Sequence, residues 1–162
     1  MKKKTPIKAG FIYSVILILI LPMLLITCKN EPVLPTQDEA KAAVWEKIQM
    51  ANDKWAAGDP MGFIECAAKD IVWSDDLGAQ NSLIGYDALN TYLEGFKGQV
   101  PPHQHELIEP VFQFYDDIVI VSYRYQGTFE GEEPGAPWKI TSVYRYADGQ
   151  WLSVHENWTE VK

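Results

Sequence analysis

Basic residues are scarce in this sequence beyond its first segment. Of the 14 Lys and Arg, four precede Cys28, so ten remain against 22 Asp and Glu, and the net charge from Cys28 onward is −12. A nucleic-acid-binding surface needs a basic patch, which these ten cations would have to supply alone. We therefore expect no nucleic-acid partner.

Several motifs with well-understood chemistry are also missing. The sequence contains no glycine-rich nucleotide loop and no nucleophile elbow, which argues against most cofactor-dependent and nucleophilic reactions. Its three histidines, His103, His105 and His155, could suggest zinc, but their spacing matches no specific metal signature. The two prolines before His103 favour a solvated strand entrance instead. We expect no metal and no cofactor.

The one long apolar run is short for a membrane span. It covers residues 11–27, which is 17 residues, whereas a helix needs about 20 to cross a bilayer core of about 30 Å. Four lysines precede the run, in the layout of a secretory signal. The stretch Leu25-Ile26-Thr27-Cys28 resembles the lipobox of bacterial lipoproteins, in which the cysteine is acylated and becomes the first mature residue. Thr27 stands where Gly, Ala or Ser is usual.

This pattern divides the chain into three parts. Residues 1–27 are predicted to be a lipoprotein signal peptide, and lipid on Cys28 would hold an exported bacterial protein at a membrane of the cell envelope. An uncleaved signal anchor is the alternative. Residues 28–35 contain two prolines and no periodic pattern, which indicates a tether. Residues 36–162 are enough for one domain, in which Cys66 is expected to be a buried apolar side chain.

The domain begins with helix signals and ends with strand signals. Thr36 to Glu39 fits a capping box, and the apolar residues that follow predict a long helix closed by Gly58. Asp59-Pro60 predicts a short second helix, and a third is expected between Gly85 and Gly98. Strands are predicted over residues 71–73, 107–115, 118–129, 138–146 and 150–159. The order predicts an α+β fold, a curved antiparallel sheet wrapped around the long N-terminal helix with two shorter helices.

Three segments resemble the SnoaL-like branch of the nuclear-transport-factor-like superfamily. They are WAAGD at 55–59, GYDAL at 85–89 and WKITSVYRYADGQWLSVHENW at 138–158. The last segment is also similar to ketosteroid isomerase and to the association domain of calcium/calmodulin-dependent kinase. The resemblance covers residues 37–160 and implies a cone-shaped, cystatin-like domain. The resemblance does not identify the function, because the superfamily includes isomerases, cyclases, dehydratases and binding modules without catalysis.

The resemblance to ketosteroid isomerase places Asp75 at the position of the catalytic base. That enzyme also needs a tyrosine and a protonated aspartate as oxyanion donors. Those two positions fall on Ala51 and Ser142 in this sequence. An enolate would lose several kcal/mol of stabilisation without the two donors, so steroid isomerisation is disfavoured.

The same alignment sets which strand residues face inward. Side chains alternate along a strand, so the inward residues are expected to be Ile140, Ser142, Tyr144, Val154, Glu156 and Trp158. Glu156 interrupts an apolar row, and burial near the charge of Asp75 should raise its pKa. In the alternative interpretation, Glu156 pairs with Arg145 or a lysine at an edge and Asp75 caps a turn.

The heavy aromatic content predicts a cone that suits a flat or apolar small molecule. The expected ligand-binding residues are Trp55, Trp73, Ser142, Tyr144 and Trp158. Two functions stay open. One is a tethered binding module without turnover, and the other is a cofactor-free isomerase, dehydratase or cyclase in which Asp75 and Glu156 transfer protons. The missing oxyanion donors favour binding.

A homodimer is also expected. Alternation would leave five residues on the outer face of the sheet, where an exposed Trp and Val form a costly apolar patch: Thr141, Val143, Trp151, Ser153 and His155. The family resemblance implies pairing through this face.

Overall fold

The computed structural model describes residues 34–161. The signal peptide predicted for residues 1–27 and the lipidation site Cys28 lie outside the described residues, as does most of the predicted tether at 28–35. Within the described part, no helix is both long enough and apolar enough to cross a membrane.

The long helix α2 (Gln37–Ala56) begins at the predicted capping box. The Thr36 hydroxyl accepts a hydrogen bond from the Glu39 N–H at 3.3 Å, and the Glu39 carboxylate accepts one from the Thr36 N–H at 2.8 Å. The helix buries one stripe of mostly small and apolar side chains, which are Ala40, Val44, Ile48, Ala51, Asn52 and Ala56. The predicted helix is confirmed, and it ends just before Gly58, whose φ of 89° reverses the chain.

A short helix α3 (Gly62–Glu65) and strand β1 (Ala67–Asp75) come next. The Asp59 carboxylate accepts a hydrogen bond from the Met61 N–H at 2.9 Å and so closes the turn that leads into α3. Both elements are predicted, but β1 is longer than residues 71–73. Its first residues are Ala-Ala-Lys-Asp, which carry no β-branched or aromatic signal.

A two-residue strand β2 (Leu83–Ile84) and helix α4 (Tyr86–Glu94) complete the first half of the domain. Strand β2 is too short to leave a periodic pattern, and the sequence does not indicate it. Helix α4 starts after Gly85 as predicted but ends at Gly95 rather than at Gly98.

Four long strands form the second half, and they match the predicted meander. They are β3 (Gln104–Tyr115), β4 (Ile118–Thr128), β5 (Trp138–Ala147) and β6 (Gln150–Glu160), paired antiparallel in that order. The whole sheet has the strand order β2-β1-β6-β5-β4-β3. Strand β1 pairs with β6 in parallel, so the sheet is mixed and the prediction of an antiparallel sheet is wrong for this pair. The α+β prediction is confirmed.

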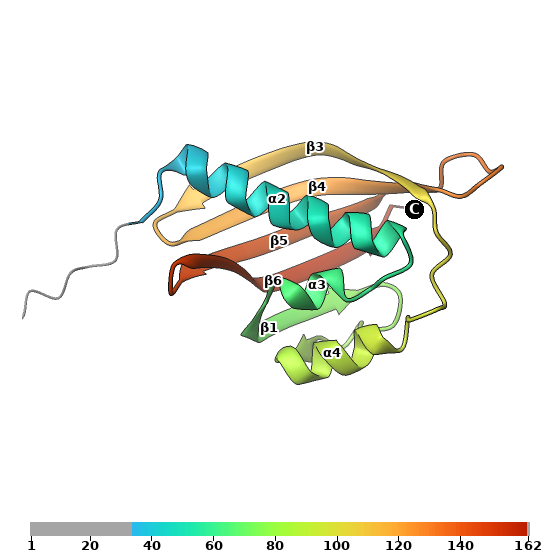
Figure 1. Ribbon diagram of the computed structural model, residues 1–162, viewed down its shortest axis with the longest axis horizontal. Coiled ribbons are helices and arrows are strands. Elements are labelled where there is room, and N and C mark those ends of the chain that lie inside the picture. Colours follow the sequence, from blue (N-terminus) through green and yellow to red (C-terminus); the bar gives the residue numbers. More distant parts are fainter. Residues whose placement is uncertain (1–33, 162) are drawn as a thin grey trace, which may run out of the picture. The chain divides into compact units, whose positions relative to one another are not determined.

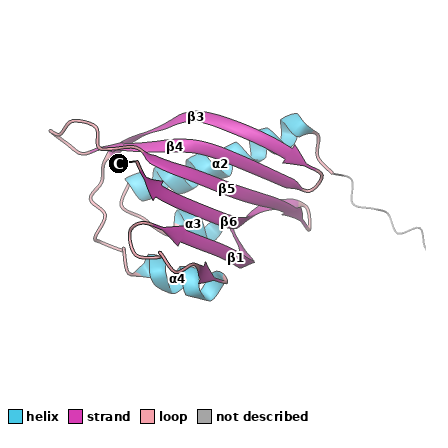
Figure 2. Cartoon of the chain, turned by 180° about the vertical axis from the view of Figure 1, so that it is seen from behind, coloured by secondary structure: helices cyan, strands magenta, loops and turns pink. Residues whose placement is uncertain are grey.

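The three helices cover one face of the curved sheet. Figure 1 shows α2 running across the strands, with α3 and α4 beside β1. In Figure 2, which views the domain from behind, the sheet lies in front of all three helices. The core lies between α2 and the inward side chains of β4, β5 and β6, and the other face of the sheet carries none of the described helices.

A β-bulge in β6 changes the predicted alternation. Val143 is opposite His155, but the next residue of β5, Tyr144, is opposite Ser153, so Val154 is an extra residue. Trp151 and Ser153 are therefore buried together with Glu156 and Trp158. The prediction that Trp151 and Ser153 face outward is wrong, as is the prediction that Val154 faces inward, because alternation assumes an unbroken register.

Candidate functional site

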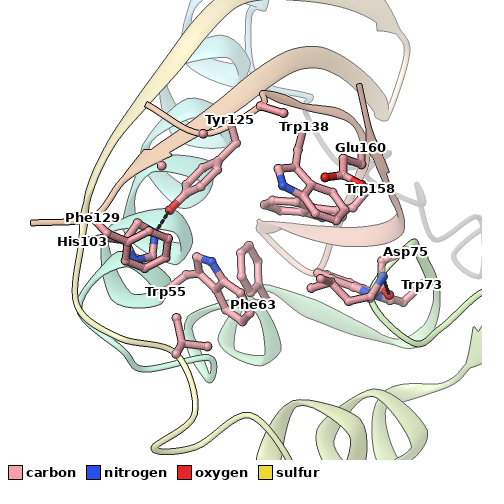
Figure 3. Close-up of a pocket in the computed structure, with 15 residues that line it drawn as sticks. Trp55, Phe63, Trp73, Asp75, His103, Tyr125, Phe129, Trp138, Trp158 and Glu160 are labelled. Carbon is pink, nitrogen blue, oxygen red and sulfur yellow. Dashed lines mark hydrogen bonds between the residues drawn. The ribbon is translucent and has the colours of Figure 1, made fainter. Parts of the chain in front are cut away.

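A cavity of about 330 Å³ opens at one end of the cone, beside the C-terminal end of α2 (Figure 3). This volume lies at the lower end of the range for small-molecule sites. Seven aromatic side chains line it, which are Trp55, Phe63, Trp73, Tyr125, Phe129, Trp138 and Trp158. Its charged or ionisable lining residues other than tyrosine are Asp75, His103 and Glu160.

Phe63, Trp73 and Trp158 form a packed aromatic wall at the inner side of the cavity. The Trp73 and Trp158 rings stack with centroids 6.0 Å apart. The Phe63 ring meets both edge-on, with centroid distances of 5.4 Å and 5.3 Å. Offset stacking and edge contacts are the favoured arrangements of aromatic rings, so this wall is rigid and presents flat apolar surface to a ligand.

His103 and Tyr125 form a hydrogen-bonded pair on another wall of the cavity (Figure 3). The Tyr125 oxygen lies 2.5 Å from His103 Nε2, and His103 Nδ1 lies 2.8 Å from the carbonyl oxygen of Pro101. Burial raises the pKa of Tyr125, so its hydroxyl keeps its proton at neutral pH. The pair is the main polar feature among the aromatic walls.

Asp75 lines the cavity but uses its oxygens to hold its own turn. Oδ1 accepts hydrogen bonds from the N–H groups of residues 77, 78 and 79 at 2.9–3.0 Å, and Oδ2 accepts one from the Trp73 indole at 2.6 Å. The Tyr92 hydroxyl lies 2.9 Å from both oxygens. Burial alone would raise the pKa of Asp75, but these donors outweigh it and the pKa lies below its ordinary value. Asp75 is thus an ionised carboxylate with its lone pairs already occupied.

Glu156 is buried behind the aromatic wall. The Ser142 hydroxyl donates to its Oε2 at 2.6 Å, and the Ser153 hydroxyl donates to its Oε1 at 2.8 Å. The bulge in β6 makes the second contact possible, because it turns Ser153 and Glu156 to the same side. Burial raises the pKa of Glu156 to about 7, and the hydrogen bonds from the two serines oppose that rise.

The two carboxyl groups do not share one cavity. Asp75 lines the large cavity, whereas Glu156 lines a separate void of about 10 Å³ that also touches Cys66 and Tyr144. Glu156 faces inward as predicted, and it does not pair with Arg145, which binds Asp70 at 2.9 Å and 3.1 Å. Asp75 does cap a turn, as the alternative interpretation expected.

The expected ligand-binding residues divide in the same way. Trp55, Trp73 and Trp158 line the large cavity. Ser142 and Tyr144 face inward but lie deeper, where Ser142 donates to Glu156 and Tyr144 borders the small void.

Several lining residues are absent from the predicted ligand-binding set. Alternation along β4 continues from the buried Tyr123 and Tyr125 through Gly127 to Phe129, and this row reaches the cavity. Trp138 lies two residues before the inward Ile140 on β5, so the same alternation predicts that Trp138 also faces the cavity. His103 left no such signal, because it precedes β3.

Two further observations concern cysteine chemistry and metal ligands. Cys66 is buried, and its burial raises the pKa of the thiol to about 11, so it behaves as the predicted apolar side chain. Among residues 34–161, no group of three His, Cys, Asp or Glu side chains is placed to hold a metal ion.

The fold and the cavity together define a cone-shaped α+β domain of the nuclear-transport-factor-like class. A model of the SnoaL-like domain matches residues 48–154, so the chain belongs to the SnoaL-like domain family. No curated protein matches the chain.

Solved structures with this fold come from several organisms. A protein from Parabacteroides distasonis, provisionally assigned as a ketosteroid isomerase, is 28% identical to this chain with a TM-score of 0.61. The match covers 71% of this chain and 85% of that protein. A nuclear-transport-factor-2-like protein of unknown function from Pseudomonas putida is 23% identical with a TM-score of 0.68, and the match covers 77% of this chain and 89% of that protein. A calcium/calmodulin-dependent kinase II hub homology domain from Chlamydomonas reinhardtii is 21% identical with a TM-score of 0.62, and the match covers 76% of this chain and 99% of that one.

Proposed function

We propose that this protein is a small-molecule-binding domain of the SnoaL-like type, which captures a flat, largely apolar molecule without turning it over. The observation that carries the proposal is the cavity of about 330 Å³ walled by seven aromatic side chains. Aromatic walls bury large ligand area at low cost in side-chain entropy. Stacked rings such as Trp73 and Trp158 are already packed before a ligand enters.

Trp138 offers the most direct test of this proposal. It lines the cavity and is half-buried at the edge of the core, so the unfolding midpoint of its variant is measured together with the affinity. Trp138→Ala should weaken binding of 2-naphthol to the full chain roughly fivefold in calorimetry, since an aromatic contact is worth on the order of 1 kcal/mol. Trp45→Ala is the matched control, because Trp45 is also half-buried but packs against Phe112 and Tyr123 outside the cavity. Equal affinity in the two variants would contradict the proposal.

A cofactor-free isomerase, dehydratase or cyclase is the second candidate. It is supported by the 28% identity to the provisionally assigned ketosteroid isomerase and by the position of Asp75 at the cavity. A proton-transfer base needs a free lone pair and a pKa near the working pH. Asp75 has its oxygens occupied and its pKa lowered, and Glu156 lies behind the aromatic wall, so the geometry favours binding.

We also propose that the domain pairs through the outer face of its sheet. One row of side chains on that face crosses β4, β5, β6, β1 and β2 in register, and it consists of Ile120, Val143, His155, Val72 and Ile84. Ile84 is 75% exposed. This row replaces the patch predicted around Trp151. Val143→Glu should convert a dimer into a monomer in light scattering at micromolar concentration, and a wild-type monomer would contradict the proposal.

The membrane anchor is proposed from the sequence alone. Acylation of Cys28 would place the binding domain at the surface of a membrane of the bacterial cell envelope, on a short tether. Mass spectrometry of the N-terminal peptide tests this, because an intact Met1 or an unmodified Cys28 would contradict it.

A further inference from the structure

The carbonyl oxygen of Pro101 decides which member of the His103–Tyr125 pair donates the hydrogen bond. The carbonyl oxygen of Pro101 accepts hydrogen bonds only, and it lies 2.8 Å from His103 Nδ1, so Nδ1 carries a proton. In the neutral imidazole, Nε2 is then bare and can only accept. The Tyr125 hydroxyl, 2.5 Å away, therefore donates its proton to Nε2.

This arrangement decides what the pair can offer to a ligand. Once the Tyr125 O–H points at His103, the remaining capacity of its oxygen is as an acceptor. A ligand group that reaches this oxygen must donate a hydrogen bond, as a hydroxyl does. A carbonyl or ether oxygen would meet an acceptor without a proton between them, which leaves both groups unpaired.

The surroundings hold Tyr125 in this orientation. The ring of His105 stacks on Tyr125 with a centroid distance of 5.3 Å and an angle of 13°, and the Trp158 ring lies 6.0 Å away on the cavity side. Tyr125 itself is only 4% exposed. Its hydroxyl is thus fixed by packing before any ligand arrives.

The backbone also positions His103. Its N–H donates to the carbonyl of Ala56 at 2.8 Å, which ties the segment before β3 to the end of α2. The imidazole lies over Gly127, where an added Cβ would approach His103 Cδ2 to 3.1 Å. Glycine at this position therefore lets the imidazole lie directly on β4.

The charges around the cavity favour a ligand without a negative charge. Asp75 and Glu160 line it, and none of the lining residues in the described part of the chain is Lys or Arg. A carboxylate or phosphate would enter against two acidic groups with no cation to pair with. A neutral hydroxyl has no such penalty.

We propose that the cavity selects neutral, flat, aromatic or polycyclic molecules that carry a hydroxyl group, and that Tyr125, oriented by His103, accepts the hydrogen bond from that hydroxyl. This inference rests on the proposed binding function and adds the chemical class of the ligand.

The test compares three probes of similar shape by calorimetry on the full chain at neutral pH. They are 2-naphthol, whose hydroxyl donates, and 2-methoxynaphthalene and 2-acetylnaphthalene, whose oxygens only accept. We expect 2-naphthol to bind roughly 3- to 10-fold more tightly than the other two, which is the usual worth of one hydrogen bond.

A variant of His103 tests the direction of the hydrogen bond. His103→Phe keeps a ring beside Phe129 but removes Nε2, so the Tyr125 O–H becomes free to donate into the cavity. The preference should then shift toward 2-acetylnaphthalene by a similar factor. Tyr115→Phe changes an exposed side chain outside the cavity and should keep the wild-type preference.

The possible results separate this inference from the proposed function. Equal binding of all three probes to the wild type, or an unchanged preference in His103→Phe, would overturn the hydroxyl selectivity but leave an aromatic binding site. Failure of all three probes to bind the wild type would overturn both.

Discussion

The buried Glu156 should make the stability of the domain fall as the pH rises through neutrality. Its pKa is about 7 in the folded protein, against 4.5 for an unperturbed glutamate. Between these two values, the folded chain keeps a proton that the unfolded chain releases, so the free energy of unfolding decreases with rising pH. The contribution is fully present below about pH 4.5 and is lost above about pH 7.

The size of this loss follows from the difference between the two pKa values. One unit corresponds to about 1.4 kcal/mol, so the loss between pH 4.5 and pH 8 is on the order of 3 kcal/mol. That is a large share of the total stability of an ordinary domain, which is roughly 5–15 kcal/mol.

Urea unfolding followed by tryptophan fluorescence at pH 5, 6, 7 and 8 measures the effect. Other groups also titrate in this range, so the informative quantity is the difference between the wild type and Glu156→Gln. The variant keeps the shape and cannot ionise, and it should lack most of the decline. Glu94→Gln, on the exposed face of α4, is the matched control and should keep the wild-type slope. Parallel curves for the wild type and Glu156→Gln would show that Glu156 is not the source of the decline.

Three other perturbations follow from the same structure. Asp75→Asn places an amide where several donors converge, so it should lower the free energy of unfolding by roughly 2–3 kcal/mol at pH 7 in urea titrations. Because the pKa of Asp75 is lowered on folding, its stabilisation is present at neutral pH and should fade as the pH falls below about 4, and a variant as stable as the wild type at pH 7 would contradict this. Gly127→Ala should displace His103 and weaken 2-naphthol binding several-fold with a small change in unfolding midpoint, and unchanged affinity would count against the role of the glycine. Ser142→Ala removes a hydrogen bond that favours the ionised Glu156, so the pKa of Glu156 should rise further and the loss of stability should become larger and extend to higher pH, which the same urea series extended above pH 8 would detect.

The elements that were predicted well are those that depend on nearby residues. The capping box at Thr36 and the apolar stripe of α2 involve contacts three or four positions apart, so the sequence displays them directly. Short turns likewise mark the ends of several long strands, because two residues separate β3 from β4 and two separate β5 from β6. The parallel pairing of β1 with β6 joins segments about half a chain apart, and no local pattern encodes it.

The site was predicted only in part, for a related reason. Trp73 and Trp158 are expected in the ligand-binding site from the aromatic content and the family resemblance, and both reach the cavity. The bulge at Val154 shifts the register of β6. Trp151 is therefore buried on the inner face, whereas unbroken alternation predicts that it is exposed on the outer face. The bond between His103 and Tyr125 spans 22 residues and depends on how β3 leaves the end of α2, which only the folded structure reveals.

The most direct test of the binding function is a crystal structure of the full chain with 2-naphthol. We expect one molecule in the cavity, between Trp138 and the wall of Phe63, Trp73 and Trp158, with its hydroxyl within hydrogen-bonding distance of the Tyr125 oxygen. An empty cavity at saturating ligand, or a molecule bound only on the outer face of the sheet, would contradict it.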